Sequence, residues 1–289
     1  DLLADQPAPL DADLLTRLAQ TDDPLLRAAA ARALERLPPD AAVRIGLDLL
    51  ADPVRLVRID AVRSLASFAR LEANIPGRES PLRRALAPAL DEYRAAQLAN
   101  AERAESWLNL GLLDTLLGDA AAAEADYRKS LALEPGFTPA HANLADLYRA
   151  LGREQDGRAV LEAGLERAPD DADLLHALGL LEIRAGRIPA AETALGRAAA
   201  LAPEQPRYAY VHALAQQAAD DLPAALATLA AAAKRHPNHR ETALALVTLN
   251  AEAGNTEAAV SWGERYLARF PDPGGQVAGL VARLRVTSD

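Results

Sequence analysis

Histidines and carboxylates are the side chains of this sequence that could bind a metal or catalyse a reaction, because the chain contains no cysteine. Among the five histidines, His236 and His239 have the H-x-x-H spacing of a possible pair of metal ligands. Pro237 lies between them and interrupts any helix, so the two rings are not expected to share a helix face. No third ligand lies nearby in the sequence. We therefore interpret the pair as solvated turn histidines.

The sequence contains no motif of a known catalytic site. GxGxxG, GxxxxGK[ST], HExxH and GxSxG are all absent. The paired acids Asp22-Asp23, Asp170-Asp171 and Asp220-Asp221 fall at predicted turns or helix starts, where carboxylates cap free N–H groups. His212 occupies a predicted packing position, which favours a core or groove histidine over a catalytic base. We therefore expect no enzyme, no cofactor, no metal and no small-molecule substrate.

Composition narrows the class of protein further. The net charge is −10, which makes nucleic acid a poor candidate partner. No apolar run reaches the length of a membrane-spanning helix, and half of the residues are hydrophobic, which is enough for a packed core. Alanine and leucine, the strongest helix formers, predominate. The composition predicts an all-α protein.

A period of 34 residues runs through the second part of the chain. It is carried by five prolines and by four glycines with Asp220 at the place of a fifth: Pro135, Pro169, Pro203, Pro237 and Pro271; Gly118, Gly152, Gly186 and Gly254. The glycine permits the left-handed backbone that closes a helix, and the proline cannot continue one. The period predicts five helix–turn–helix repeats at 104–137, 138–171, 172–205, 206–239 and 240–273.

These repeats resemble the tetratricopeptide repeat family, whose pattern is W-x2-L-G-x2-Y, then A-x3-F, then P. The first repeat matches it at Trp107, Leu110, Gly111, Ala123, Tyr127 and Pro135, and departs where Asp114 replaces the usual aromatic residue. The resemblance implies a right-handed α-solenoid superhelix that binds proteins. Residues 104–273 would form this array, and residues 274–289, with a helix at 276–285, would cap its end.

A looser repeat precedes this array. Asp23-Pro24, followed by Arg27, echoes Asp52-Pro53, followed by Arg58. The pattern resembles the second helix of HEAT-type repeats, with first helices expected at 11–20 and 40–50. We therefore divide the first part of the chain into HEAT-like helical hairpins at 1–71 and a connecting region at 72–103. The connecting region would contain a loop at 72–80 and a half-repeat helix at 82–103.

In the family, the first helix of each repeat lines a concave groove. The resemblance places Leu108, Leu112, Asp146, His176, Leu180, Tyr210, Leu214, Leu244 and Thr248 on that face. Such a surface suits an apolar helix or strand of another chain. The alternative is that the leucines contact the neighbouring repeat and leave little groove. The family's clamp for a peptide carboxylate is not expected here, because only Asn109 and Asn143 resemble it, and both are expected to hydrogen-bond locally.

Three functions remain open at this point. The first is head-to-tail self-association into a filament or tube, in which an arm containing Leu2-Leu3 and the 6–9 segment lies in the groove of the next copy. The second is a scaffold domain, because the repeat order and residues 143–149 resemble the C-terminal part of exported bacterial multihaem cytochromes. The third is a peptide-binding adaptor. The resemblance to the exported cytochromes and the absence of cysteine favour an exported protein, periplasmic or extracellular.

Overall fold

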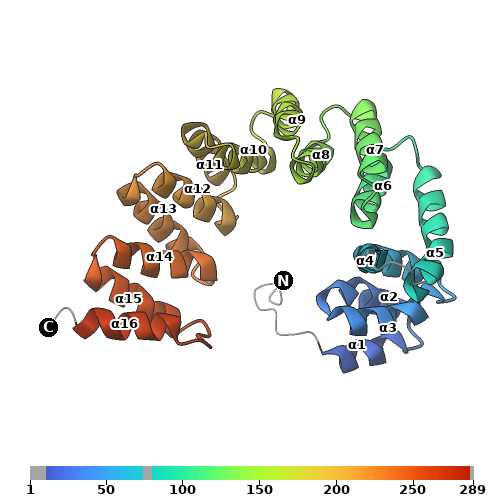
Figure 1. Ribbon diagram of the computed structural model, residues 1–289, viewed down its shortest axis with the longest axis horizontal. Coiled ribbons are helices and arrows are strands. Elements are labelled where there is room, and N and C mark those ends of the chain that lie inside the picture. Colours follow the sequence, from blue (N-terminus) through green and yellow to red (C-terminus); the bar gives the residue numbers. More distant parts are fainter. Residues whose placement is uncertain (1–10, 74–79, 287–289) are drawn as a thin grey trace. The chain divides into compact units, whose positions relative to one another are not determined.

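The computed structural model describes residues 11–73 and 80–286, which form sixteen α-helices and one short 3-10 helix (Figure 1). The helices are α1 (Ala12–Ala19), α2 (Pro24–Ala33), η1 (Leu34–Arg36), α3 (Pro39–Leu50), α4 (Arg55–Ala73), α5 (Pro81–Leu98), α6 (Ala104–Leu117), α7 (Ala120–Leu133), α8 (Thr138–Ala150), α9 (Glu154–Arg167), α10 (Ala172–Arg184), α11 (Ile188–Leu201), α12 (Pro206–Ala218), α13 (Leu222–Arg235), α14 (Arg240–Glu252), α15 (Thr256–Leu267) and α16 (Gln276–Val286). The predicted all-α repeat array is confirmed, and neighbouring helices pack in pairs.

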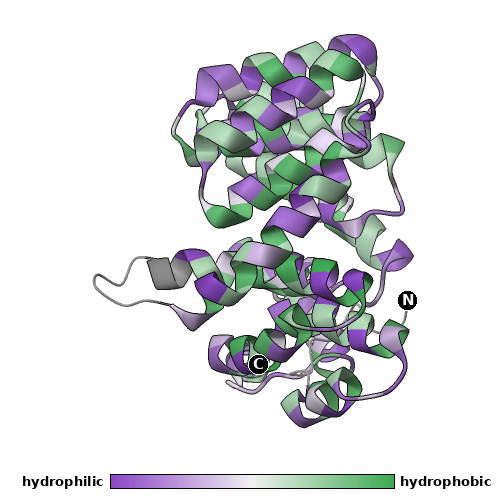
Figure 2. Ribbon diagram, turned by 90° about the vertical axis from the view of Figure 1, so that its right-hand side faces the viewer, coloured by the Kyte–Doolittle hydropathy of each residue, from purple (hydrophilic) through white to green (hydrophobic). Residues whose placement is uncertain are grey.

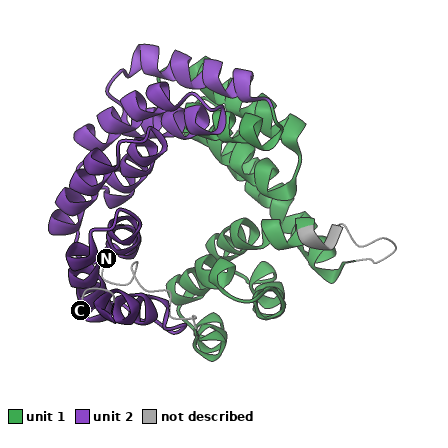
Figure 3. Ribbon diagram, turned by 60° about the vertical axis from the view of Figure 1, so that its left-hand side comes forward, with its two compact units in different colours: residues 1–152 green, residues 153–289 purple. Residues whose placement is uncertain are grey.

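The chain forms two compact units, residues 1–152 and residues 153–289 (Figure 3). The first contains α1 to α8, and the second contains α9 to α16. Figure 2 shows hydrophobic and hydrophilic residues mixed along the helices, as expected where one face packs and the other meets water. Within the described residues, no helix is both long enough and apolar enough to cross a bilayer.

Aspartate side chains start several of these helices. The carboxylates of Asp23, Asp171 and Asp221 accept hydrogen bonds from the N–H groups of Leu25, Leu174 and Ala224 at the beginnings of α2, α10 and α13, at 2.8–3.0 Å. Each is the second member of an acidic pair in the sequence, so the prediction that these pairs cap helices is confirmed. The caps satisfy N–H groups that the first helical turn cannot bond internally.

The turns inside the repeats depend on a left-handed residue. Gly118, Gly152, Gly186 and Gly254 have φ angles of +71° to +84°, and Asp220, at the equivalent place in the fourth repeat, has a φ angle of +62°. Asp220 is therefore the one described residue other than glycine with a positive φ. A residue with a Cβ is strained in this conformation, although aspartate tolerates it better than most.

Replacing Asp220 with glycine tests whether the strain is real. We expect Asp220→Gly to raise the free energy of unfolding by up to about 1 kcal/mol, and Gly186→Ala to lower it by roughly 1–2 kcal/mol. A Cβ on Gly186 would meet no atom within 4 Å, so its cost comes from the backbone alone. Urea unfolding followed by circular dichroism measures both changes. A clear destabilisation by Asp220→Gly would mean that the aspartate side chain has another role.

Close contact between the two helices of a repeat needs small residues. A Cβ on Gly111 of α6 would lie 2.6 Å from the Tyr127 ring of α7, so the ring packs directly on the helix backbone. Ala123 of α7 and Ala191 of α11, which belong to the second helices, are fully buried. The described part of the repeat array thus packs by fitting large residues against glycine and alanine.

Successive repeats are also joined at their ends. The backbone carbonyl of the repeat-ending proline accepts a hydrogen bond from a side chain of the following repeat in four cases. The pairs are His141 to Pro135, Arg197 to Pro169, His236 with Arg235 to Pro203, and Arg269 to Pro237, with most distances at 2.8–2.9 Å and Arg235 at 3.4 Å. These bonds satisfy carbonyls that no longer belong to a helix.

Acidic side chains replace the family's aromatic residue in two of the first helices. Asp114 is buried and receives Arg94 of α5 at 2.8 Å. Glu182 is only 1% exposed and pairs with Arg187, with Arg158 of α9 at 3.5 Å. An unpaired carboxylate would be costly at either buried place. In both cases arginines compensate the negative charge that stands where the family has an aromatic ring.

Arginine–carboxylate pairs also link the helices that precede the repeats. Arg27 of α2 forms a two-point pair with Asp52 at 2.6 and 3.1 Å. Arg58 of α4 forms another with Glu92 of α5, both bonds at 2.7 Å. Burial alone would raise the pKa of Asp52, but Arg27 and the N–H of Val54 hold it below its ordinary value. The Arg58 guanidinium likewise lowers the pKa of Glu92.

Two predicted boundaries differ from the structure. The helix predicted at 82–103 begins at Pro81 and ends at Leu98. A turn follows it, and the indole N–H of Trp107 in α6 donates to the carbonyl of Ala101 in that turn at 2.7 Å. α4 extends to Ala73, two residues into the loop predicted at 72–80, and residues 74–79 of that loop lie outside the described residues. The predicted helices at 11–20, 40–50 and 276–285 form as α1, α3 and α16.

Candidate functional site: a polar-rimmed pocket on the first helices

The groove residues expected in the first unit lie on α6 and α8. Leu108 and Leu112 of α6 are half-buried, and Asp146 of α8 is exposed. The structure brings Leu112 and Asp146 to a single pocket of about 350 Å³ and leaves Leu108 outside its lining. The remaining lining comes from α4, α5, α6, α7 and α8: Arg63, Tyr93, Asn109, Leu113, Thr115, Leu116, Tyr127, Asn143, Leu147, Arg149 and Ala150.

The floor of this pocket is apolar and fixed by packing. Tyr93, Leu113 and Tyr127 are each at most 3% exposed. The Tyr127 hydroxyl lies 3.0 Å from the hydroxyl of Thr115, which also donates to the carbonyl of Gly111 at 2.8 Å. Burial raises the pKa of both tyrosines, so both phenols are neutral at ordinary pH. A guest side chain would therefore meet an uncharged, preorganised surface.

The rim carries the polar groups. The Asn109 amide donates to the Gln97 side chain at 3.2 Å, and the Asn143 amide donates to the carbonyl of Pro139 at 2.7 Å. The Asn109 amide thus bonds the preceding helix, α5, and the Asn143 amide bonds its own helix. No described residue donates to either side-chain oxygen, so both remain able to accept from a bound chain.

Charge at the rim is mixed. Arg149 donates to Asp146 at 3.0 Å, an exposed pair of the kind that contributes little to stability. Arg63 of α4 is exposed, and within the described residues it forms no ion pair. The asparagine oxygens of the rim can therefore accept hydrogen bonds from backbone N–H groups of a bound chain. Arg63 can bind a carbonyl or carboxylate group of that chain.

His176 of α10 is buried within the second unit. This residue was expected to face a groove, yet it is only 8% exposed, because the Tyr208 ring of α12 stacks on it with centroids 4.4 Å apart. Neither ring nitrogen has a hydrogen-bond partner among the described residues. The pKa of His176 is lowered to about 4, mainly by burial. The charge of Arg207 contributes to this lowering, and the charge of Asp173 partly opposes both effects. The imidazole is therefore neutral at ordinary pH.

The buried histidine predicts a loss of stability in mild acid. Unfolding returns its pKa to about 6.5, so the unfolded chain binds the extra proton and stability falls as the pH drops from 6.5 towards 4. Between about pH 7.5 and about pH 5 this group alone should remove about 2 kcal/mol. The variant His176→Phe keeps the stacked ring without the proton. Urea unfolding at both pH values should show the smaller loss in the variant, and equal losses would contradict this account.

The other expected groove residues of this unit divide between packing and exposure. Leu180 and Tyr210 contact the cluster of Leu195 and Val211, as the alternative of inter-repeat packing predicts. Leu214 and Thr248 are half-buried, and the Thr248 hydroxyl donates to carbonyls of its own helix. Leu244 is 37% exposed.

Sequence reasoning missed part of the pocket in the first unit. Thr115 and Leu116 lie three and four residues after Leu112, and Arg149 lies three after Asp146, so helical spacing could have added them. Tyr93 precedes Tyr127 by 34 residues, so the period could have added it as well. Arg63 could not be found in this way, because its helix lies outside the period. His236 and His239 make local hydrogen bonds in the turn before α14. The His236 ring bonds the carbonyl of Pro203, and the His239 ring caps α14 by bonding Thr242. No cluster of three potential metal ligands occurs in the described residues.

Residues 114–181 and residues 210–272 each match a family model described as a tetratricopeptide repeat. These segments are tetratricopeptide repeats. Such repeats are typically non-catalytic scaffolds for protein–protein interaction, and no enzyme family matches. Among curated proteins, a sequence search finds no significant match.

Solved structures share the tetratricopeptide repeat fold at low sequence identity. Yeast Tom70 is 14% identical with a TM-score of 0.61, over 96% of this chain and 58% of its own. PilW, a type IV pilus biogenesis factor, is 18% identical with a TM-score of 0.55, over 76% and 98%. YrrB, described as a tetratricopeptide repeat protein with an unusual peptide-binding site, is 20% identical with a TM-score of 0.50, over 67% and 97%. At such low identities, the structural likeness establishes the fold alone.

Proposed function

We propose that this protein is a non-catalytic adaptor that binds an extended segment of a partner protein at the pocket of α4 to α8. The observation that carries the proposal is the combination of an apolar floor with a rim of unoccupied amide oxygens and an unpaired arginine. An extended chain presents apolar side chains and free backbone N–H groups together, and this surface offers a partner for each. The volume of about 350 Å³ suits one large apolar side chain with its flanking backbone.

A peptide selection tests this function. Peptides selected from a random library on the purified chain should bind Leu112→Glu about tenfold more weakly or worse, because a carboxylate replaces apolar contact at the rim. The matched control is Leu133→Glu, since Leu133 is an exposed leucine of the same unit outside the pocket. Fluorescence polarisation measures both affinities. Failure to enrich any peptide, or equal effects of the two substitutions, would overturn the proposal.

We further propose that copies of the chain associate head to tail. The predicted arm at Leu2-Leu3 and 6–9 lies outside the described residues, so the support comes from the next helices. Leu14 of α1 and Leu25 and Leu26 of α2 are 42%, 65% and 43% exposed at the N-terminal end of the first unit. The terminal repeats of helical arrays need a polar outer face to remain separate, and exposed leucines there favour contact with another copy.

The mass of the protein in solution tests this association. Light scattering after size-exclusion chromatography should show a mass that rises with concentration, and the pair Leu14→Glu with Leu25→Glu should remove the rise. The pair Leu133→Glu with Leu201→Glu is the control, because it changes two comparably exposed leucines elsewhere. A monomer at every concentration would exclude self-association.

We also infer that the HEAT-like hairpins predicted at 1–71 form over residues 11–71, the part of that range that the structure describes. The two Asp-Pro turns are followed by the arginines that the pattern expects, and Arg27 of the first copy binds Asp52 of the second at 2.6 Å. Arg58 of the second copy continues the series to Glu92 of α5. The two ion pairs thus join consecutive parts of this region, as contacts between neighbouring repeats do.

A further inference from the structure

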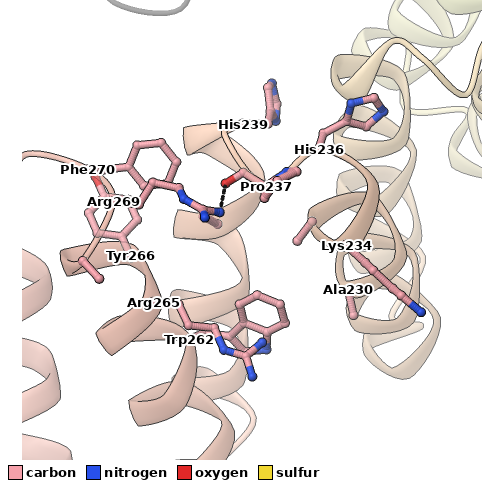
Figure 4. A pocket seen from close by; sticks show the side chains of 13 residues that line it. Ala230, Lys234, His236, Pro237, His239, Trp262, Arg265, Tyr266, Arg269 and Phe270 are labelled. Carbon is pink, nitrogen blue, oxygen red and sulfur yellow. Dashed lines mark hydrogen bonds between the residues drawn. The ribbon is translucent and has the colours of Figure 1, made fainter.

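A second pocket, of about 570 Å³, lies in the other unit between the second helices α13 and α15 and the turn that leads into α14 (Figure 4). None of the groove residues expected from the sequence lines it. It is therefore a separate feature from the pocket on the first helices.

Charge distinguishes this pocket from the rest of the chain. Lys234 of α13 and Arg265 of α15, together with Arg269 just beyond α15, line it, and no acidic residue does. Across the described residues, none of these three cations forms an ion pair. Arg269 donates to the carbonyl of Pro237 at 2.8 Å, which fixes its guanidinium beside the pocket. Three uncompensated cations in one hollow of a chain of net charge −10 form a local site for anions.

One wall of the same pocket is aromatic. Trp262, Tyr266 and Phe270 follow one another at intervals of four residues, and the Tyr266 and Phe270 rings lie 5.1 Å apart. The Arg265 guanidinium lies 4.7 Å from the centre of the Trp262 ring. A stacked guanidinium keeps the N–H groups on its edge available, and these match the two oxygens of a carboxylate.

We propose that this pocket binds an acidic segment of a partner protein. Asp or Glu carboxylates of the segment bind Lys234, Arg265 and Arg269, and apolar side chains between them pack against Trp262 and Phe270. Each element of the pocket then has a counterpart in the ligand: cations for carboxylates, and aromatic rings for an apolar side chain.

The chemistry favours a peptide over a membrane or a nucleic acid. Both of those present an extended sheet or line of negative charge, which the net charge of −10 repels over a Debye length of about 8–10 Å. A short segment enters the hollow and meets the local cations without bringing a large anionic surface near the remaining carboxylates. The aromatic wall can also pack against an apolar side chain, whereas a phosphate surface offers it no apolar group.

Fluorescence polarisation with a defined probe tests the proposal. The probe is a short fluorescein-labelled peptide in which Asp and Glu residues flank a Phe and a Leu. It should bind the full chain, and the double variant Lys234→Gln with Arg265→Gln should bind it about tenfold more weakly or worse. Both residues are exposed and unpaired, so the substitutions leave the fold intact, which circular dichroism verifies.

The matched control is Arg44→Gln with Arg167→Gln, which removes the same total charge at exposed positions outside both pockets. It should change the affinity less than twofold. Failure of the wild-type chain to bind the probe, or equal weakening in both double variants, would overturn the proposal. Binding of anionic phospholipid vesicles that depends on Lys234 and Arg265 would assign the pocket to a membrane surface instead. Neither result bears on the pocket of α4 to α8, which Leu112→Glu tests separately.

Discussion

The repeat array depends on a carbonyl group that its own repeat leaves without a partner. A proline ends each second helix, and the oxygen at that proline points to the next repeat, which supplies an arginine or histidine donor in all four described cases. The bond does two things at once. It satisfies a backbone group left by the end of the helix, and it fixes the separation of consecutive repeats at the place where the chain turns back. Prolines at a constant period thus require donors in every following repeat.

The sequence shows this architecture only in part. The period of prolines and glycines predicts the helix pairs, and acidic pairs such as Asp170-Asp171 predict where helices start, because both signals are local. The donors to the proline carbonyls could not be predicted from one spacing, because only Arg235 and Arg269 share theirs, at 32 residues after the proline. Arg197 follows its proline by 28 residues and Arg269 by 32, while His141 follows by only six. Several side chains can reach the same oxygen, so no single pattern records the contact.

The candidate site shows the same division. Leu112 and Asp146, both expected on the groove face, line one pocket, and helical spacing within each helix was enough to select them. The burial of His176 could not be predicted, because the ring that covers it belongs to Tyr208, in the next repeat. The departure at Asp114 was visible in the sequence, but its partner Arg94 lies on the helix before the repeats begin. Contacts between repeats, unlike those within a helix, depend on packing that one sequence does not specify.

The chain contains two tryptophans, and one falls in each unit, Trp107 in the first and Trp262 in the second. Their surroundings differ, since a lysine ammonium lies 4.0 Å above the first indole and an arginine lies beside the second. Because helical repeats interact mainly with their neighbours, the two halves of such an array can melt independently. Each indole is therefore a natural optical probe of its own half, and removing either one leaves emission that follows the other alone.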